Sequence, residues 1–181
     1  QVIKTYLCPS DPSVPGDYLV TNPSVGIIAP FAVGCYAFNF QVFGYTGAAT
    51  SVAPANPPQL VDYSVGARGN ISIQKLSDGT SMTILFAEKY SRCLTSSQAP
   101  INGPGTERGA LWAWWDSGWV YYPRFAWQTW WNTGAGPASK FQVQPVPFLG
   151  AASKCDGART QTSHSTMNVV MGDGSVRGLS A

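Results

Sequence analysis

The sequence predicts a β-rich α+β domain, in which an antiparallel sheet with hairpins carries long loops and little helix. Its 181 residues include 19 glycines and 14 prolines, a composition typical of many turns. Asp-Gly pairs at positions 78–79 and 173–174 each stand between apolar runs, which is the pattern of a β-hairpin. Apolar residues do not recur with a sustained period of 3.6, so long amphipathic helices are not expected.

The clearest hairpin lies at the end of the chain. Residues 167–171 and 175–179 are predicted to be its strands, joined by Gly172, Asp173 and Gly174. Asp-Gly at the centre of such a turn favours type I′, in which both central residues have positive φ.

Four further strands are predicted upstream. Residues 2–7 form the first, which ends before Pro9, and residues 35–43 form the second. Residues 71–76 and 81–90 flank the other Asp-Gly turn. Within the last of these, the apolar run 84–87 suits a central strand, and the next residue, Glu88, is expected to pair with Arg or Lys because a lone buried carboxylate is costly.

The chain length favours a single domain, residues 1–181, with an aromatic-rich insertion at about 94–150. Only 11% of the residues are charged, against about 25% in an ordinary soluble domain. Aromatic residues reach 13%, which argues against disorder. The net charge is +2 and no basic cluster occurs, so no nucleic-acid partner is expected.

The four cysteines predict disulfides. Their number is even, none occurs in Cys-x-x-Cys, and one histidine is too few for the usual zinc spacings. Disulfides imply an oxidising, extracytoplasmic compartment: the cell surface, the periplasm or the medium. Three pairings remain open on spacing alone for the four residues Cys8, Cys35, Cys93 and Cys155.

His164 is the only histidine, and it admits a catalytic and a structural interpretation. Serines flank it and Asp173 lies nearby, but sequence proximity does not define a Ser-His-Asp triad, and the chain has no Gly-x-Ser-x-Gly elbow. We therefore predict no catalytic residue, and a hydrolase using His164 is the weakest alternative. The structural interpretation has His164 bond a backbone carbonyl or a carboxylate and fix the loop before the last hairpin.

All seven tryptophans fall within residues 112–131. Such a cluster can form part of the core or a subunit interface, and exposed Trp faces can also stack on sugar rings. The first two interpretations are favoured, and a carbohydrate-binding surface module is the rival function. The candidate ligand or subunit contacts are Trp112, Trp114, Trp115, Trp119, Trp127, Trp130 and Trp131.

Cofactor motifs are absent from the sequence. Walker and dinucleotide fingerprints do not occur, so no cofactor and no metal ligand are predicted. The two Asp-Gly turns faintly resemble calcium loops, but each aspartate stands alone. A single calcium ion bound by loops far apart in the sequence stays open as an alternative.

Four motifs occur in one order. They are Tyr-Leu-Cys-Pro-Ser-Asp-Pro at 6–12, Phe-Gln-Val-Phe-Gly at 40–44, Leu-Ser-Asp-Gly-Thr-Ser-Met-Thr-Ile-Leu-Phe-Ala-Glu-Lys at 76–89, and His164 leading to Asp-Gly-Ser-Val-Arg at 173–177. Together they resemble the bacterial family of prepilin-like proteins, related to type II secretion pseudopilins, over most of the chain. That family carries a C-terminal signature of His, nine residues and Asp-Gly, whereas eight residues follow His164 here.

The resemblance implies a pilin-like globular head displayed outside the cytoplasm. In the family a basic leader and a long apolar helix precede the head, and that helix anchors the protein in the membrane and packs subunits into a filament. The 181 residues correspond to the head alone, so contact with the membrane is expected only through that missing N-terminal helix. The expected function is a structural, non-catalytic subunit of a filament or secretion-associated complex, with itself or other pilin-like subunits as partners.

The resemblance also implies a disulfide pairing. The segments around Cys93 and Cys155 look like matched features that flank a variable middle, so Cys93–Cys155 and Cys8–Cys35 are the expected pairs. They would close loops of about 61 and 26 residues, each worth about 3–4 kcal/mol by chain entropy.

Overall fold

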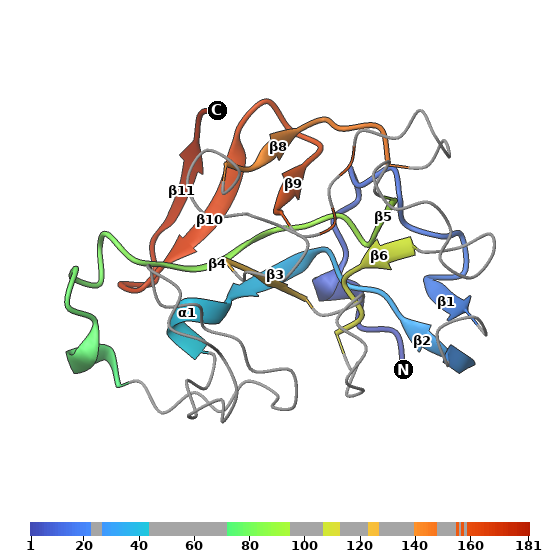
Figure 1. Ribbon diagram of the computed structural model, residues 1–181, viewed down its shortest axis with the longest axis horizontal. Helices are drawn as coiled ribbons and strands as arrows, with labels where there is room; N and C mark the ends of the chain where they lie inside the picture. Colours follow the sequence, from blue (N-terminus) through green and yellow to red (C-terminus); the bar gives the residue numbers. More distant parts are fainter. Residues whose placement is uncertain are drawn as a thin grey trace, which may run out of the picture.

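A computed structural model describes residues 1–22, 27–43, 72–94, 107–112, 123–126, 140–147, 155, 157 and 159–181. This part of the chain is β-rich, and its one α-helix, α1, has four residues (Figure 1). None of its helices is long and apolar enough to cross a membrane. The elements are η1 (Lys4–Tyr6), β1 (Leu19–Asn22), β2 (Ile27–Ala32), β3 (Tyr36–Asn39), α1 (Phe40–Phe43), η3 (Ile73–Lys75), β4 (Ile84–Glu88), β5 (Arg92–Leu94), β6 (Glu107–Gly109), β7 (Arg124–Phe125), β8 (Gln142–Val143), β9 (Gln161–Thr162), β10 (Met167–Met171) and β11 (Val176–Leu179).

The largest sheet has five strands in the order β11-β10-β4-β3-β7. Three of its pairs are antiparallel, and β7 joins β3 in parallel. The apolar run 84–87 lies in β4 at the centre of this sheet, as predicted. The run is not buried on both faces, however, because Ala87 is buried, Ile84 and Leu85 are half-buried, and Phe86 is 41% exposed.

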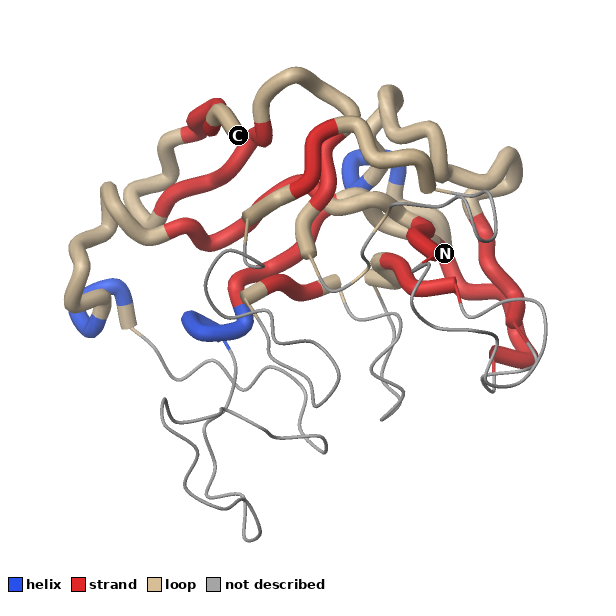
Figure 2. The backbone as a smooth tube through the Cα atoms, turned by 45° about the horizontal axis from the view of Figure 1, so that its top comes forward, coloured by secondary structure: helices blue, strands red, loops and turns tan. Residues whose placement is uncertain are grey.

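Three two-stranded sheets accompany the large one, and Figures 1 and 2 show β1–β2 and β5–β6 beside it. The pairs β1–β2 and β5–β6 are antiparallel, but β8–β9 is parallel. The prediction of an antiparallel sheet is therefore correct for most pairs and wrong for two. Both parallel pairs join strands far apart in the sequence, and parallel pairing needs such long connections.

The C-terminal hairpin has the predicted strands but a different turn. The amide of Gly174 donates to the Met171 carbonyl at 3.0 Å, so Gly172 and Asp173 occupy the central positions. Only Gly174 has positive φ, at 81°. The loop thus has three residues, with a left-handed glycine after the turn, and the predicted type I′ turn is wrong.

Two predicted strands are absent from the described residues. Residues 4–6 form the 3₁₀ turn η1, and residues 73–75 form η3, while Ile71 lies outside the described residues. Ile73 is 66% exposed, so its alternation with polar neighbours does not mark a buried face. A strand needs a partner edge for its backbone groups, and neither segment pairs with one.

The predicted strand 35–43 is correct only in its first half. β3 ends at Asn39, whose side-chain amide donates to the Ile84 carbonyl at 2.9 Å. The chain then coils into α1, which places the Phe43 ring 6.2 Å from Phe38 and 5.5 Å from Phe86. Aromatic packing thus favours a helical turn where the sequence pattern suggests continued strand.

The described core consists of three clusters. Along β10, alternate side chains are buried, as a half-buried strand requires. These side chains pack on Ala87 of β4. The second cluster joins Val20 of β1 to the bridged pair Val33 and Leu111, and the third surrounds Tyr90. The buried members are Ala87, Met167, Val169 and Met171; Val20, Val33 and Leu111; and Tyr90, Cys93 and Cys155.

Gly172 to alanine is expected to destabilise the protein by about 1–3 kcal/mol. A Cβ at this position would lie 2.8 Å from the Thr80 carbonyl oxygen and 3.1 Å from the Thr80 Cα. Both are backbone atoms, and the loop is held there by hydrogen bonds from Gly172 to Thr83 and from Asp173 to Thr80. Urea unfolding measures the change.

Gly16 to alanine is the matched control, because a Cβ there meets nothing within 4 Å. Its free energy of unfolding is expected to stay within about 0.5 kcal/mol of the parent value. Equal effects at the two positions would show that the two Asp-Gly turns do not pack as described.

Candidate functional site

Three side chains from distant parts of the sequence converge at the end of the central strand. Cys8 follows η1, Glu88 ends β4, and His164 follows β9. The His164 Nε2 atom lies 3.8 Å from the Cys8 sulfur and 3.4 Å from Glu88 Oε1. All three atoms lie within 4.8 Å of one another. Cys8 and Glu88 are buried, and the His164 side chain is 38% exposed, so the cluster opens to solvent on the histidine side.

The Glu88 carboxylate is held on both oxygens. The Thr162 hydroxyl donates to Oε2 at 2.5 Å, and the Asn168 backbone and side-chain amides donate to Oε2 and Oε1 at 3.3 and 2.8 Å. The prediction that Glu88 pairs with an Arg or Lys is therefore wrong. Lys89, the adjacent residue, points away from Glu88 and donates to the carbonyls of Arg124 and Gly157, because successive side chains leave a strand on opposite faces.

His164 contacts a carboxylate, as its structural interpretation predicted, and that carboxylate is Glu88. Its backbone amide also donates to the Thr162 hydroxyl at 3.0 Å. Both Cys8 and Glu88 approach the same ring nitrogen, Nε2. A Cys-His-acid relay needs the nucleophile on one nitrogen and the acid on the other, so the cluster does not have the geometry of a catalytic triad.

A buried carboxylate organises the neighbouring loop. Asp11 accepts bonds on Oδ1 from the Ser13 amide and hydroxyl at 2.8 and 2.6 Å. Its Oδ2 accepts from the Ser91 amide at 2.8 Å and from the Cys35 thiol at 3.3 Å. Asp11 thus joins the loop that carries Cys8 to Cys35, the residue before β3, and to Ser91 between β4 and β5.

Of the two expected disulfides, the structure contains Cys93–Cys155, with Cα atoms 5.5 Å apart. The pair Cys8–Cys35 is not formed, and both are buried free thiols. Their sulfurs are engaged elsewhere, since that of Cys8 faces His164 and that of Cys35 donates to Asp11. The expectation that all four cysteines are bridged is therefore wrong in this structure.

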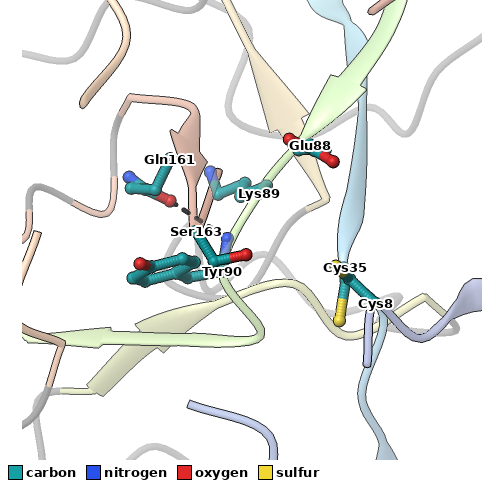
Figure 3. Close-up of a pocket in the computed structure, with 7 residues that line it drawn as sticks. All are labelled: Cys8, Cys35, Glu88, Lys89, Tyr90, Gln161 and Ser163. Carbon is teal, nitrogen blue, oxygen red and sulfur yellow. Dashed lines mark hydrogen bonds between the residues drawn. The ribbon is translucent and has the colours of Figure 1, made fainter. Parts of the chain in front are cut away.

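A small cavity adjoins the cluster, with room for about one water molecule (Figure 3). Burial, and then the charge of Asp11, raise the pKa of the Cys35 thiol, which therefore keeps its proton. Burial raises the pKa of Tyr90 to about 12, so its hydroxyl stays a donor near the Thr162 carbonyl, 3.5 Å away. The lining residues are Cys8, Cys35, Glu88, Lys89, Tyr90, Gln161 and Ser163.

Trp112 is the one predicted tryptophan contact within the described residues. It is 36% exposed, and its ring meets Tyr6 edge to face at 6.0 Å between centroids. The other six candidates, Trp114, Trp115, Trp119, Trp127, Trp130 and Trp131, lie outside the described residues.

Each member of the cluster has a predicted role from the sequence, but the sequence does not predict that the three side chains lie close together. Cys8 was expected in a disulfide, Glu88 in an ion pair and His164 in a structural hydrogen bond. Asp11 was missed, although it belongs to the first of the four motifs, and a carboxylate between two prolines in a weakly charged chain was the available signal.

Comparison with known proteins gives a family but no solved relative. Neither a search of curated proteins nor a search of solved structures finds a match. A family model described as "Protein of unknown function (DUF1559)" matches residues 1–181. Because the match spans the whole sequence, the chain belongs to that family.

Proposed function

We propose that this chain is the globular head of a pilin-like, pseudopilin-related subunit, which is displayed outside the cytoplasm and assembles into a filament or a secretion-associated complex. Its role in that assembly is structural and non-catalytic. Its partners are further copies of itself or other pilin-like subunits, and its attachment to the membrane runs through an apolar helix preceding the head.

One observation carries the proposal: three of the four motifs behind the prepilin resemblance meet in space. Cys8 and Asp11 belong to the first motif, Glu88 to the third and His164 to the last. Cys8 and Glu88 both contact His164, and Asp11 bonds Ser91, three residues after Glu88. A shared head fold requires the motif residues to form one structural unit. Here that unit holds the N-terminal loop and the segment after β9 against the end of β4.

The compartment is argued from the cysteines. Disulfides persist outside the cytoplasm and are rare within it, and Cys93 is bonded to Cys155. The non-catalytic role is argued from the cluster, where the imidazole has both neighbours on one nitrogen. A histidine held in that way positions a loop, and it lacks the orienting acid that a general base needs.

Fractionation of cells that make the natural gene product tests the proposal, with an antibody raised against this chain as the probe. The protein is expected in the periplasmic, sheared-surface or medium fractions, with Cys93 and Cys155 oxidised on non-reducing gels. Chemical cross-linking of intact cells is expected to give a ladder of oligomers. A cytoplasmic protein with reduced cysteines, or a monomer after cross-linking, would exclude the assembly function.

The exposed Tyr6–Trp112 pair favours one second candidate, a carbohydrate-binding surface. Sugar rings stack on exposed aromatic faces whose edges can also form hydrogen bonds. Glycan-array binding that is lost in Trp112→Ala and kept in Tyr36→Ala, an equally exposed aromatic on β3, would support this function. Equal binding by both variants, or none by the parent chain, would exclude a role for this pair.

A further inference from the structure

We propose that Cys8, Glu88 and His164 form a binding site for one zinc ion, which clamps the N-terminal loop and the C-terminal segment to the end of the central sheet. The three ligands are drawn from residues 8, 88 and 164, so the ion would join segments at the two ends of the sequence. The proposal goes beyond the assembly function and stands without it.

Two of the three separations between the ligand atoms match a tetrahedral zinc site. With zinc–ligand bonds of about 2.3 Å to sulfur and about 2.1 Å to nitrogen or oxygen, tetrahedral angles place sulfur and nitrogen about 3.6 Å apart, and nitrogen and oxygen about 3.4 Å apart. The observed separations are 3.8 Å from the Cys8 sulfur to His164 Nε2 and 3.4 Å from that nitrogen to Glu88 Oε1. The third pair, the Cys8 sulfur and the Glu88 oxygen, lies within 4.8 Å, against about 3.6 Å in a tetrahedral site. Zinc binding therefore requires the Cys8 side chain and the Glu88 carboxylate to approach each other by up to about 1.2 Å.

Hydrogen bonding alone does not account for this arrangement. With a proton on Nε2, the single N–H has two neighbours, the Glu88 oxygen and the Cys8 sulfur, and can direct a full hydrogen bond at only one. With Nε2 unprotonated, the Cys8 thiol can donate to it, but the Glu88 oxygen then faces a lone pair. A cation at the centre satisfies all three atoms together.

The ligand types and charges also suit zinc. Thiolate, imidazole and carboxylate are the three side chains that bind zinc in proteins, and a thiolate selects against calcium and magnesium. Bound in this way, Cys8 and Glu88 carry two negative charges at a buried position. A divalent cation neutralises both, whereas the same charges without it would be strongly unfavourable.

The surroundings hold one ligand in place and leave room for a fourth. Thr162 and Asn168 fix the Glu88 carboxylate, and such bonds behind a ligand orient it toward a metal. We take a water in the adjoining cavity, which Cys8 and Glu88 line, as the fourth ligand. Cys35 lines the same cavity, but its thiol is bonded to Asp11, and it does not belong to the three-atom cluster.

Zinc titration of the untagged chain tests the site, after purification with reductant and removal of metals by a chelator. Competition with a chromophoric chelator is expected to give one zinc per chain, with a dissociation constant below about 1 μM. Cobalt in place of zinc is expected to show the thiolate-to-metal charge-transfer band that a cysteine ligand produces. The substitutions Cys8→Ser, Glu88→Gln and His164→Gln should each weaken zinc binding more than about tenfold.

Two further variants separate ligation from folding. Cys35→Ser keeps the donor to Asp11 and is expected to bind zinc and cobalt as the parent does. Thr162→Val keeps all three ligands but loses the bond to Glu88, and is expected to bind zinc about tenfold more weakly. Melting of each metal-free variant shows whether it is folded, and zinc should raise the melting temperature only where the site is intact.

Any of four results would overturn the proposal. The parent chain could bind zinc only at millimolar concentration, or bind cobalt without the charge-transfer band. Cys35→Ser could lose as much affinity as Cys8→Ser, which would assign the metal to the two thiols instead. Non-reducing peptide mass spectrometry of protein prepared without reductant could find Cys8 bonded to Cys35, which would remove Cys8 as a ligand.

Discussion

The substitution Asp11→Ala is expected to lower the free energy of unfolding by about 3–5 kcal/mol, because it removes the buried carboxylate that accepts the hydrogen bonds of this loop. The carboxylate accepts hydrogen bonds from two backbone amides, those of Ser13 and Ser91. Without it, two buried N–H groups lose their partner, and each unmade bond costs about 1–3 kcal/mol. Urea unfolding followed by circular dichroism measures the difference.

Asp17 to alanine is the matched control for Asp11. It is also an aspartate in the N-terminal loop that accepts a backbone bond, from Leu19 at 3.1 Å, but it is exposed. Water can replace that acceptor, so a change of about 0.5 kcal/mol is expected. Asp11→Asn should fall between the two, since it keeps one acceptor oxygen. A loss at Asp11 no larger than that at Asp17 would contradict the proposed role of the buried carboxylate.

Removal of the Cys93–Cys155 disulfide is expected to cost about 4 kcal/mol. The two residues are 62 positions apart, and the chain-entropy estimate for a loop of that length gives this magnitude. The bridge is buried against Tyr90, so its loss also leaves a packing defect. The double variant Cys93→Ala and Cys155→Ala, compared with the parent in urea, gives the value.

Cys35 to alanine serves as the control for the disulfide, because it removes a buried sulfur without opening a bridge. It is expected to cost less than the double variant, about 1–2 kcal/mol for the lost packing and thiol bond. Thiol counting in denaturant, on the parent protein prepared without reductant, should find two free cysteines, Cys8 and Cys35. Four free thiols, or equal destabilisation by the two variants, would show that the bridge does not form in solution.

Strands marked by a polarity pattern in consecutive residues could be predicted from the sequence. The alternation of β10 correctly gives its buried face, and β4 lies at the apolar run 84–87, although Phe86 in that run is 41% exposed. Alternation of apolar and polar residues wrongly predicts a strand at residues 71–76, because such a pattern records side-chain polarity and not the presence of a partner strand. Ile73 shows the difference, since it is exposed in a 3₁₀ turn.

In the last hairpin, neighbouring residues predict the position of the turn but not its type. Asp173-Gly174 correctly located the turn, but its type depends on which residues stand at the centre. The loop around it bonds to Thr80 and Thr83 of the other Asp-Gly turn, a contact between segments about 90 residues apart. Such packing selects among turns of similar intrinsic stability.

Residue chemistry was determined by the sequence alone: a weakly charged, aromatic-rich chain with one histidine, four cysteines and a glutamate after a buried strand. Only the tertiary structure decided which of these residues meet. The order of the strands brings Cys8 within reach of His164, 156 positions away, and leaves Cys8 and Cys35 as thiols while Cys93 joins Cys155. Distances between side chains follow from how strands pair and loops close, and no spacing along the chain encodes them.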